Sequence, residues 1–309
     1  AQKFIITDGH IDTPWRMHKG GYEDISVRTP GGDFDYVRAK QGGLDVPFMS
    51  IYVPASYQVT GGAKDKADEL IGIVERVTTD HPDKFEIAHS VSDAERIVAE
   101  GKIALPMGME NGAPLEGDLS NLKYFRKRGI SYITLTHAED NDICDSSYNL
   151  GERTHNGLSE FGVEVVKKMN RIGIMVDISH VSDEAFYQVM DVTEVPAIAT
   201  HSSCRHFTPG WERNMSDDMI KRLAENGGVI QINFASYFVD QDSKDSKGPV
   251  DADVSKYVAD NNIDPQEIYK VSEDLYYKFA SMLRINLSNK LEDIEKDIYK
   301  KWPKGKDER

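Results

Sequence analysis

The sequence predicts an α/β protein of the TIM-type (β/α)₈ barrel class. Short apolar runs alternate with longer amphipathic stretches along the 309 residues, which is typical of βα units around a parallel sheet. Histidines and carboxylates recur where the apolar runs end, and this is where such a barrel carries its functional residues. We expect one domain, residues 1–309, because this length suits a single large α/β barrel.

Seven apolar runs within residues 1–234 are the expected strands. Each run is short, is rich in aliphatic residues, and is separated from the next by a polar or amphipathic segment. The seven runs are Phe4–Ile11, Val46–Val53, Lys102–Met109, Ser131–Thr136, Ile174–Ile178, Ala197–Thr200 and Val229–Phe234.

Capping signals predict where several helices begin and end. The stretch from Ser92 to Glu95 has the Ser-x-x-Glu spacing of a capping box, and Gly101 stands where that helix would stop. Ser159 and Ser216 each precede an amphipathic stretch and are expected N-caps. Beyond the last strand, we expect a polar surface excursion over 240–262 and a helical extension over 264–309.

Charge and cysteine content exclude several classes of protein. Lys and Arg number 37 against 52 Asp and Glu, so the formal charge of −15 argues against nucleic acid or an anionic membrane as a partner. No apolar run approaches the roughly 20 residues that span a bilayer. Two cysteines, Cys144 and Cys204, exclude a disulfide framework and a cysteine-built zinc site; one bridge and two free thiols both stay open.

The ends of the expected strands carry metal-ligating residue types. His10 and Asp12 are two residues apart, so an extended backbone directs both side chains to one side. Glu110 follows the third run and His137 the fourth. An isolated histidine at a strand end is more often structural, but the repetition here favours a metal centre.

Two further histidines complete the pattern. His180 follows the fifth run and His201 the sixth, so four of the nine histidines end strands. His10, Asp12, Glu110, His180 and His201 are more ligands than one catalytic zinc takes. A shared carboxylate would bridge two ions about 3.5–4 Å apart and leave a place for a bridging hydroxide. Glu110 is the natural bridge, and the implied chemistry is metal-assisted hydrolysis.

These motifs make the chain resemble the membrane dipeptidase (renal dipeptidase) family of zinc metallopeptidases, within the amidohydrolase-like superfamily. The resemblance runs to about Phe234, with the motifs in family order. The matching stretches are Asp8–Asp12, Met109–Asn111, Leu135–His137, Gly157–Gly162, Val176–Ser182, Thr200–Ser203 and Glu212–Asp217.

The resemblance implies a binuclear zinc enzyme that hydrolyses dipeptides, including some with a C-terminal D-residue. His10 and Asp12 would hold one zinc ion, and His180 and His201 the other, with Glu110 bridging both. His137 would stabilise the tetrahedral intermediate, and Arg213 would pair with the free carboxylate of the substrate. A further expectation from the family is a homodimer; the family and the absence of an initiator Met before Ala1 favour an extracytoplasmic location, although a trimmed start would look the same.

The resemblance also predicts an eighth strand that ends in an aspartate, and we expect this strand and the closing helices to be absent from the chain. A sheet of seven strands would keep two unpaired edges. We therefore expect a fragment of an active enzyme. A separate C-terminal segment that completes the barrel, or a non-catalytic zinc-binding protein ending at Arg309, are the alternatives. A related barrel amidohydrolase acting on a lactam, lactone or N-acyl amino acid is the competing enzyme class.

Overall fold

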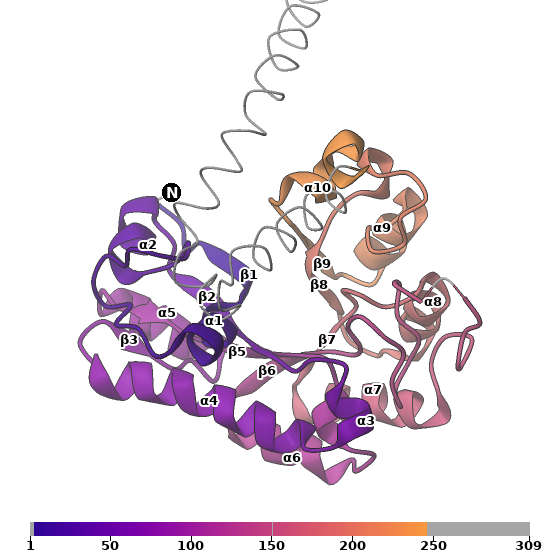
Figure 1. The fold of residues 1–309 in the computed structure, drawn as a ribbon, viewed down its shortest axis with the longest axis horizontal. Coiled ribbons are helices and arrows are strands. Elements are labelled where there is room, and N and C mark those ends of the chain that lie inside the picture. Colours follow the sequence, from indigo (N-terminus) through magenta and orange to yellow (C-terminus); the bar gives the residue numbers. More distant parts are fainter. Residues whose placement is uncertain (1–2, 150, 246–309) are drawn as a thin grey trace, which may run out of the picture.

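The computed structural model describes residues 3–149 and 151–245, and its central feature is a curled parallel sheet (Figure 1). Seven strands pair in chain order, each parallel to the next, to form a nearly closed barrel of the TIM type. The strands are β1 (Thr7–Ile11), β2 (Val46–Tyr52), β5 (Met107–Glu110), β6 (Ile130–Thr134), β7 (Met175–Asp177), β8 (Ile198–Ser202) and β9 (Val229–Ile232).

All seven expected strands are present, but most of the predicted boundaries are wrong by one to three residues, and the largest differences lie in the first and third runs. The chain enters β1 only at Thr7, and Phe4 before it is 72% exposed. The third run is split into two strands. Its first part, β4 (Ile103–Ala104), pairs with β3 (Phe85–Glu86) in a separate small sheet, whereas its second part is β5 in the barrel. Pro106 lies between them and has no N–H for a strand ladder.

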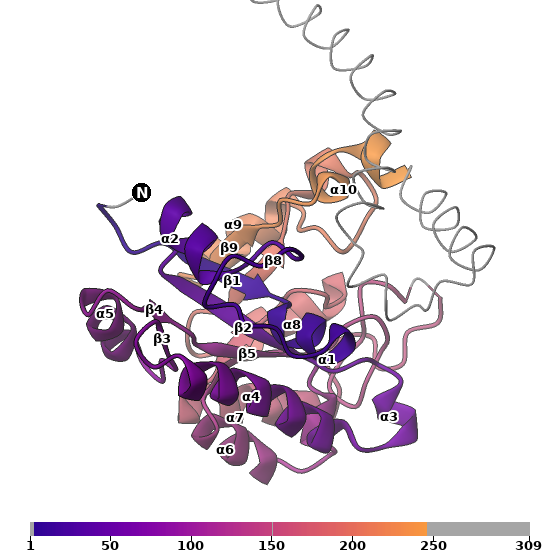
Figure 2. The same ribbon diagram turned by 60° about the vertical axis from the view of Figure 1, so that its left-hand side comes forward.

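Helices cover the outer face of the sheet, as the two views of the ribbon show (Figures 1 and 2). Two short 3₁₀ turns, Ala113–Leu115 and Arg205–Phe207, lie in loops after β5 and β8. The helices are α1 (Thr13–Gly20), α2 (Tyr36–Gly42), α3 (Tyr57–Thr60), α4 (Ala63–Asp80), α5 (Val91–Ala99), α6 (Ser120–Lys127), α7 (Glu160–Ile172), α8 (Asp183–Val192), α9 (Asp217–Glu225) and α10 (Ser236–Val239).

Two of the three expected N-caps are confirmed. The Ser159 side chain accepts a hydrogen bond from the backbone of the first turn of α7, and Ser216 does the same for α9. The prediction for α5 was wrong by two residues. Ser90 is its cap, because its extended backbone lets Oγ accept from the Asp93 N–H, and Ser92 lies inside the helix.

β1 and β8 approach one another closely across the barrel. A Cβ atom on Gly9 of β1 would lie 2.6 Å from the carbonyl oxygen of Thr200 in β8, so the glycine permits this close approach. Among the described residues β1 pairs only with β2, and β9 only with β8. The helical extension expected over 264–309, and most of the excursion expected over 240–262, lie outside the described residues.

The structure also answers the questions that the sequence raised about the cysteines and about membrane-spanning segments. Cys144 and Cys204 are both free thiols, so they do not form the one possible bridge. Within the part of the chain that the structure describes, we find no helix with the length and apolar character needed to cross a bilayer.

Candidate metal centre

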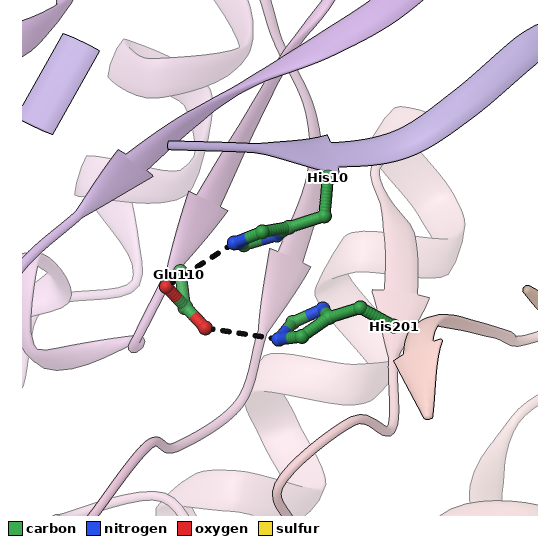
Figure 3. Close-up of side chains that lie close together, drawn as sticks. All are labelled: His10, Glu110 and His201. Atoms are coloured by element: carbon green, nitrogen blue, oxygen red, sulfur yellow. Dashed lines mark hydrogen bonds and ion pairs between the residues drawn. The ribbon is translucent and has the colours of Figure 1, made fainter. Parts of the chain in front are cut away.

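Side chains from the carboxyl ends of several strands converge on the Glu110 carboxylate (Figure 3). Glu110 ends β5 and is almost fully buried. His10 of β1 approaches one carboxylate oxygen, with Nε2 3.4 Å from Oε2. His201 of β8 approaches the other oxygen, with Nε2 3.0 Å from Oε1. The carboxylate therefore lies between two histidines that are 191 residues apart in the sequence.

The other expected site residues lie around the same carboxylate. His180, just after β7, has Nε2 3.1 Å from Glu110 Oε1 and 2.8 Å from His201 Nε2. His137, after β6, has Nε2 3.6 Å from the same Oε1. Asp12 Oδ1 is 3.5 Å from His10 Nε2, although its side chain is mostly exposed. The structure thus brings together all the side chains that the sequence singled out as metal ligands.

The backbone at His180 has an unusual conformation, which helps to set the direction of its side chain. Its φ is 72°, in the left-handed region that few non-glycine residues adopt. The carbonyl of His180 accepts a hydrogen bond from Ser147 N at 2.8 Å, and Asp177 Oδ1 accepts one from Ser179 N at 3.0 Å. These bonds hold the turn after β7 in a conformation that histidine does not favour by itself.

Glu110 is held in its charged form by its neighbours. Burial alone would raise the pKa of Glu110, but the imidazoles of His10 and His137 outweigh burial and hold that pKa well below its usual value. Burial lowers the pKa of His201 to about 4, and nearby His10 acts in the same direction. A carboxylate thus faces an imidazole that stays neutral at ordinary pH.

The other imidazoles differ in their electrostatics. Burial and then the charge of Arg213 lower the pKa of His180 well below its usual value. Burial also lowers the pKa of His137, against the opposing effect of Glu110. Burial acts to lower the pKa of His10 as well, but Tyr132 and the nearby carboxylates outweigh it, so the pKa of His10 is raised well above its usual value.

This set of donors suits divalent zinc. Imidazole nitrogens and carboxylate oxygens are ordinary zinc ligands, and neutral imidazoles present the lone pair that a metal needs. Two overlapping groups have ligand atoms within 4.8 Å of one another, and Glu110 belongs to both; they are His10, Glu110 and His201, and Glu110, His137 and His180. The family resemblance instead pairs His180 with His201, whose Nε2 atoms lie 2.8 Å apart.

Arg213 adds a buried positive charge beside this cluster. Its guanidinium is 2% exposed and donates to Ser202 Oγ at 2.8 Å and to the His201 carbonyl at 2.6 Å. The Nη2 atom also lies 3.0 Å from His180 Nε2, and the buried Nε has no hydrogen-bond partner. None of these hydrogen-bond partners is an anion, which leaves the charge suited to an incoming anion.

A cavity of about 1130 Å³ opens over the cluster and Arg213. This volume exceeds the roughly 300–1,000 Å³ of usual small-ligand pockets, so size alone does not select the substrate. Aromatic side chains that sequence reasoning missed also line it, among them Trp15, Tyr52 and Tyr148. The Tyr52 ring lies 4.8 Å from that of His137, and its place at the end of β2 is the only signal that the sequence offered.

A parallel α/β barrel with such a cluster at the carboxyl ends of its strands is the arrangement that metal-dependent barrel hydrolases use. Comparison with protein families is more specific. The model for membrane dipeptidases, peptidase family M19, matches residues 1–265. The chain therefore belongs to the membrane dipeptidase family, as its motifs predicted.

Individual relatives agree with this membership. The dipeptidase tcpJ of Claviceps purpurea is 34% identical over 253 residues, which cover 76% of this chain and 58% of tcpJ. The probable dipeptidase PvdM of Pseudomonas aeruginosa has a similar structure, with a TM-score of 0.68, 29% identity, and coverage of 74% of this chain and 60% of PvdM. Dipeptidase AC, a metallo peptidase of family M19, gives a TM-score of 0.70 at 25% identity, covering 78% of this chain and 75% of that one. The chain thus spans about three-fifths of the length of tcpJ and PvdM.

Proposed function

We propose that this protein is a zinc-dependent dipeptidase that hydrolyses the single peptide bond of a dipeptide, including dipeptides with a C-terminal D-residue. The proposal rests on one observation: the two oxygens of the Glu110 carboxylate face different histidines. One oxygen faces His10 at 3.4 Å, and the other faces His201 at 3.0 Å and His180 at 3.1 Å. A carboxylate shared in this way suits a bridge between two metal ions.

In this proposal Glu110 would be a ligand of two zinc ions. His10 and Asp12 would hold one ion, and His180 and His201 would hold the other. When bound, the pair of ions supplies an activated water as the nucleophile and polarises the carbonyl that it attacks. The low pKa of Glu110 and the neutral form of His180 and His201 are both consistent with metal ligation.

Two residues of the chain act on the substrate directly. Arg213 binds the free carboxylate of the dipeptide, because its planar fork of N–H donors matches a carboxylate and its charge is buried beside the cluster. His137 lies in the same cavity and donates a hydrogen bond to the oxygen on which negative charge develops. Together they orient the scissile bond over Glu110.

Metal removal tests the function. The protein is stripped with a chelator, restored with zinc or with magnesium as the control ion, and assayed on L,L and L,D dipeptides, an N-acyl amino acid, a lactam and a lactone. We expect cleavage of dipeptides alone, abolished by stripping and restored by zinc. Undiminished cleavage after complete zinc removal refutes the metal-dependent function, whereas preference for one of the other substrates refutes the substrate class.

A matched pair of variants links the metal to Glu110. Glu110→Gln keeps the shape of the side chain but removes the charge, so we expect the zinc content to fall together with the activity. Glu116→Gln makes the same change on an exposed side chain after β5 and is expected to change neither quantity. Equal zinc content in the two variants contradicts the bridging role.

A further inference from the structure

Two of the histidines in the cluster contact hydroxyl groups through the ring nitrogen that faces away from Glu110. His10 Nδ1 is 3.0 Å from Tyr132 Oη, and His201 Nδ1 is 2.8 Å from Thr200 Oγ1. A neutral imidazole carries its proton on one nitrogen only, and the partner of the other nitrogen decides which one. The direction of these two hydrogen bonds therefore decides where each ring presents its lone pair.

The Tyr132 hydroxyl already donates its single proton to another hydrogen bond. Its oxygen lies 3.0 Å from the carbonyl oxygen of Gly9, which can only accept a hydrogen bond. Tyr132 therefore donates to Gly9 and accepts from His10, which places the His10 proton on Nδ1. When the His10 ring is neutral, its Nε2 lone pair then faces Glu110 Oε2, 3.4 Å away.

The position of Tyr132 depends on a glycine in the neighbouring strand. Tyr132 of β6 is fully buried and is the register partner of Gly108 in β5. A Cβ atom on Gly108 would lie 1.9 Å from the Tyr132 ring, so any larger residue would displace the phenol. The absence of a side chain at Gly108 thus lets the phenol cross the barrel interior to reach β1.

The Thr200 hydroxyl likewise donates its single proton, in this case to Asp177. Asp177 is fully buried, and its Oδ2 lies 2.7 Å from Thr200 Oγ1 and 2.5 Å from Thr134 Oγ1. Its Oδ1 accepts from the backbone N–H groups of Ser179 and Thr200, each at 3.0 Å. A carboxylate among four donors accepts the Thr200 proton, so Thr200 accepts from His201 Nδ1–H.

We propose that Tyr132 and Thr200 are positioning residues that hold His10 and His201 as Nδ1–H tautomers, so that both Nε2 lone pairs face Glu110. The inference rests on the proposed zinc centre for its purpose. When both rings are neutral, two lone pairs and a carboxylate face one another, and a cation between them removes the resulting repulsion. The two hydroxyls therefore orient the ligating nitrogens of His10 and His201 before a metal ion binds.

Zinc affinity, measured by competition with a chromophoric chelator, tests the proposal. Tyr132→Phe and Thr200→Val each remove one hydroxyl, and we expect each to weaken zinc binding about 10- to 100-fold, as loss of an outer partner of a ligating histidine does. Thr200→Ser keeps the hydroxyl and is expected to retain most of the affinity. Thermal unfolding of each metal-free variant separates a loss of affinity from a loss of folding.

Two control variants make the same chemical changes away from the histidines. Thr134→Val removes a hydroxyl from the same Asp177 carboxylate, and Tyr124→Phe removes a phenol that hydrogen-bonds Asp68 at 2.9 Å on the outside of the barrel. We expect both to bind zinc as the wild type does. The proposal is refuted if Thr134→Val weakens zinc binding as much as Thr200→Val, or if Tyr132→Phe and Thr200→Val bind as the wild type does.

The tautomers are also observable without metal. Long-range ¹⁵N–¹H spectra of the metal-free chain, labelled on histidine and recorded at a pH where both rings are neutral, distinguish Nδ1–H from Nε2–H. We expect Nδ1–H for His10 and His201 in the wild type, and a mixture at His10 in Tyr132→Phe. An Nε2–H tautomer at either residue of the wild type overturns the proposal. A wild type that binds no zinc but shows Nδ1–H at both refutes only the metal centre.

Discussion

Replacing Arg213 with methionine separates its proposed role from a structural one. The guanidinium is buried beside the cluster, and its partners include Ser202 Oγ, the His201 carbonyl and the His180 ring. A substrate carboxylate would add charge-assisted hydrogen bonds worth about 1.5–3 kcal/mol. Arg213→Met is therefore expected to lower kcat/KM for a dipeptide about 10- to 150-fold, at about 1.4 kcal/mol for each factor of ten.

The assay compares each dipeptide with its C-terminal amide, which lacks the carboxylate. We expect the wild type and Arg213→Met to cleave the amide equally, because neither can form the ion pair with it. Arg222→Met, which changes an arginine paired with Asp191 on the surface, is the control for the substitution itself, and zinc content is measured in every sample. An equal loss on the dipeptide and its amide refutes carboxylate recognition by Arg213 and strengthens the case for another amide, lactam or lactone as substrate.

Three further predictions concern catalysis, pH and stability. His137→Ala is expected to lower kcat about 10²- to 10³-fold while zinc content stays constant, because it removes a donor to the oxyanion rather than a ligand. In the metal-free protein, the lowered pKa values of His180 and of His201 (about 4) mean that the unfolded state binds more protons below pH 6.5. The free energy of unfolding, measured in urea titrations, is therefore expected to decrease as the pH is lowered from 6.5 to 4. The expected decrease is about 1.4 kcal/mol per pH unit for each histidine. Asp35→Ala should lower the free energy of unfolding by about 3 kcal/mol in the same titrations, because the buried carboxylate caps α2 and accepts from Arg38 and Thr29.

Each of these predictions has a contradictory outcome. Loss of zinc in proportion to activity in His137→Ala would make His137 a ligand, as its place beside Glu110 and His180 also allows. A free energy of unfolding that is flat between pH 6.5 and 4 would contradict the buried neutral histidines. A loss below about 1 kcal/mol in Asp35→Ala would mean that water replaces the hydrogen bonds of the carboxylate.

The residues that cluster around Glu110 could be picked out from the sequence because they obey a local rule. Each follows a short apolar run, and parallel strands in a barrel deliver the residues after such runs to the same rim. His10, Glu110 and His201 met for this reason, although the spacing between them along the chain carries no information about distance. Where a strand was predicted to begin too early, as at Phe4, the boundary was wrong but the type of element was right.

Tyr132 could not be found in the same way. It looks like an ordinary core residue of a strand, and its contact with His10 depends on Gly108 in β5 and on the approach of β1 across the barrel. The left-handed backbone of His180 is equally hidden, because hydrogen bonds from neighbouring segments impose it against the preference of the residue.

Strand order, parallel sense and the identity of the rim residues follow from patterns within about ten residues, since hydrophobic periodicity and side-chain alternation are local properties of the chain. The division of Glu110 between two groups of histidines, the burial of the Arg213 charge, and the hydroxyls behind His10 and His201 depend on contacts across the barrel interior. Packing sets those contacts to within a few tenths of an ångström, and only the folded barrel brings the partners within reach of one another.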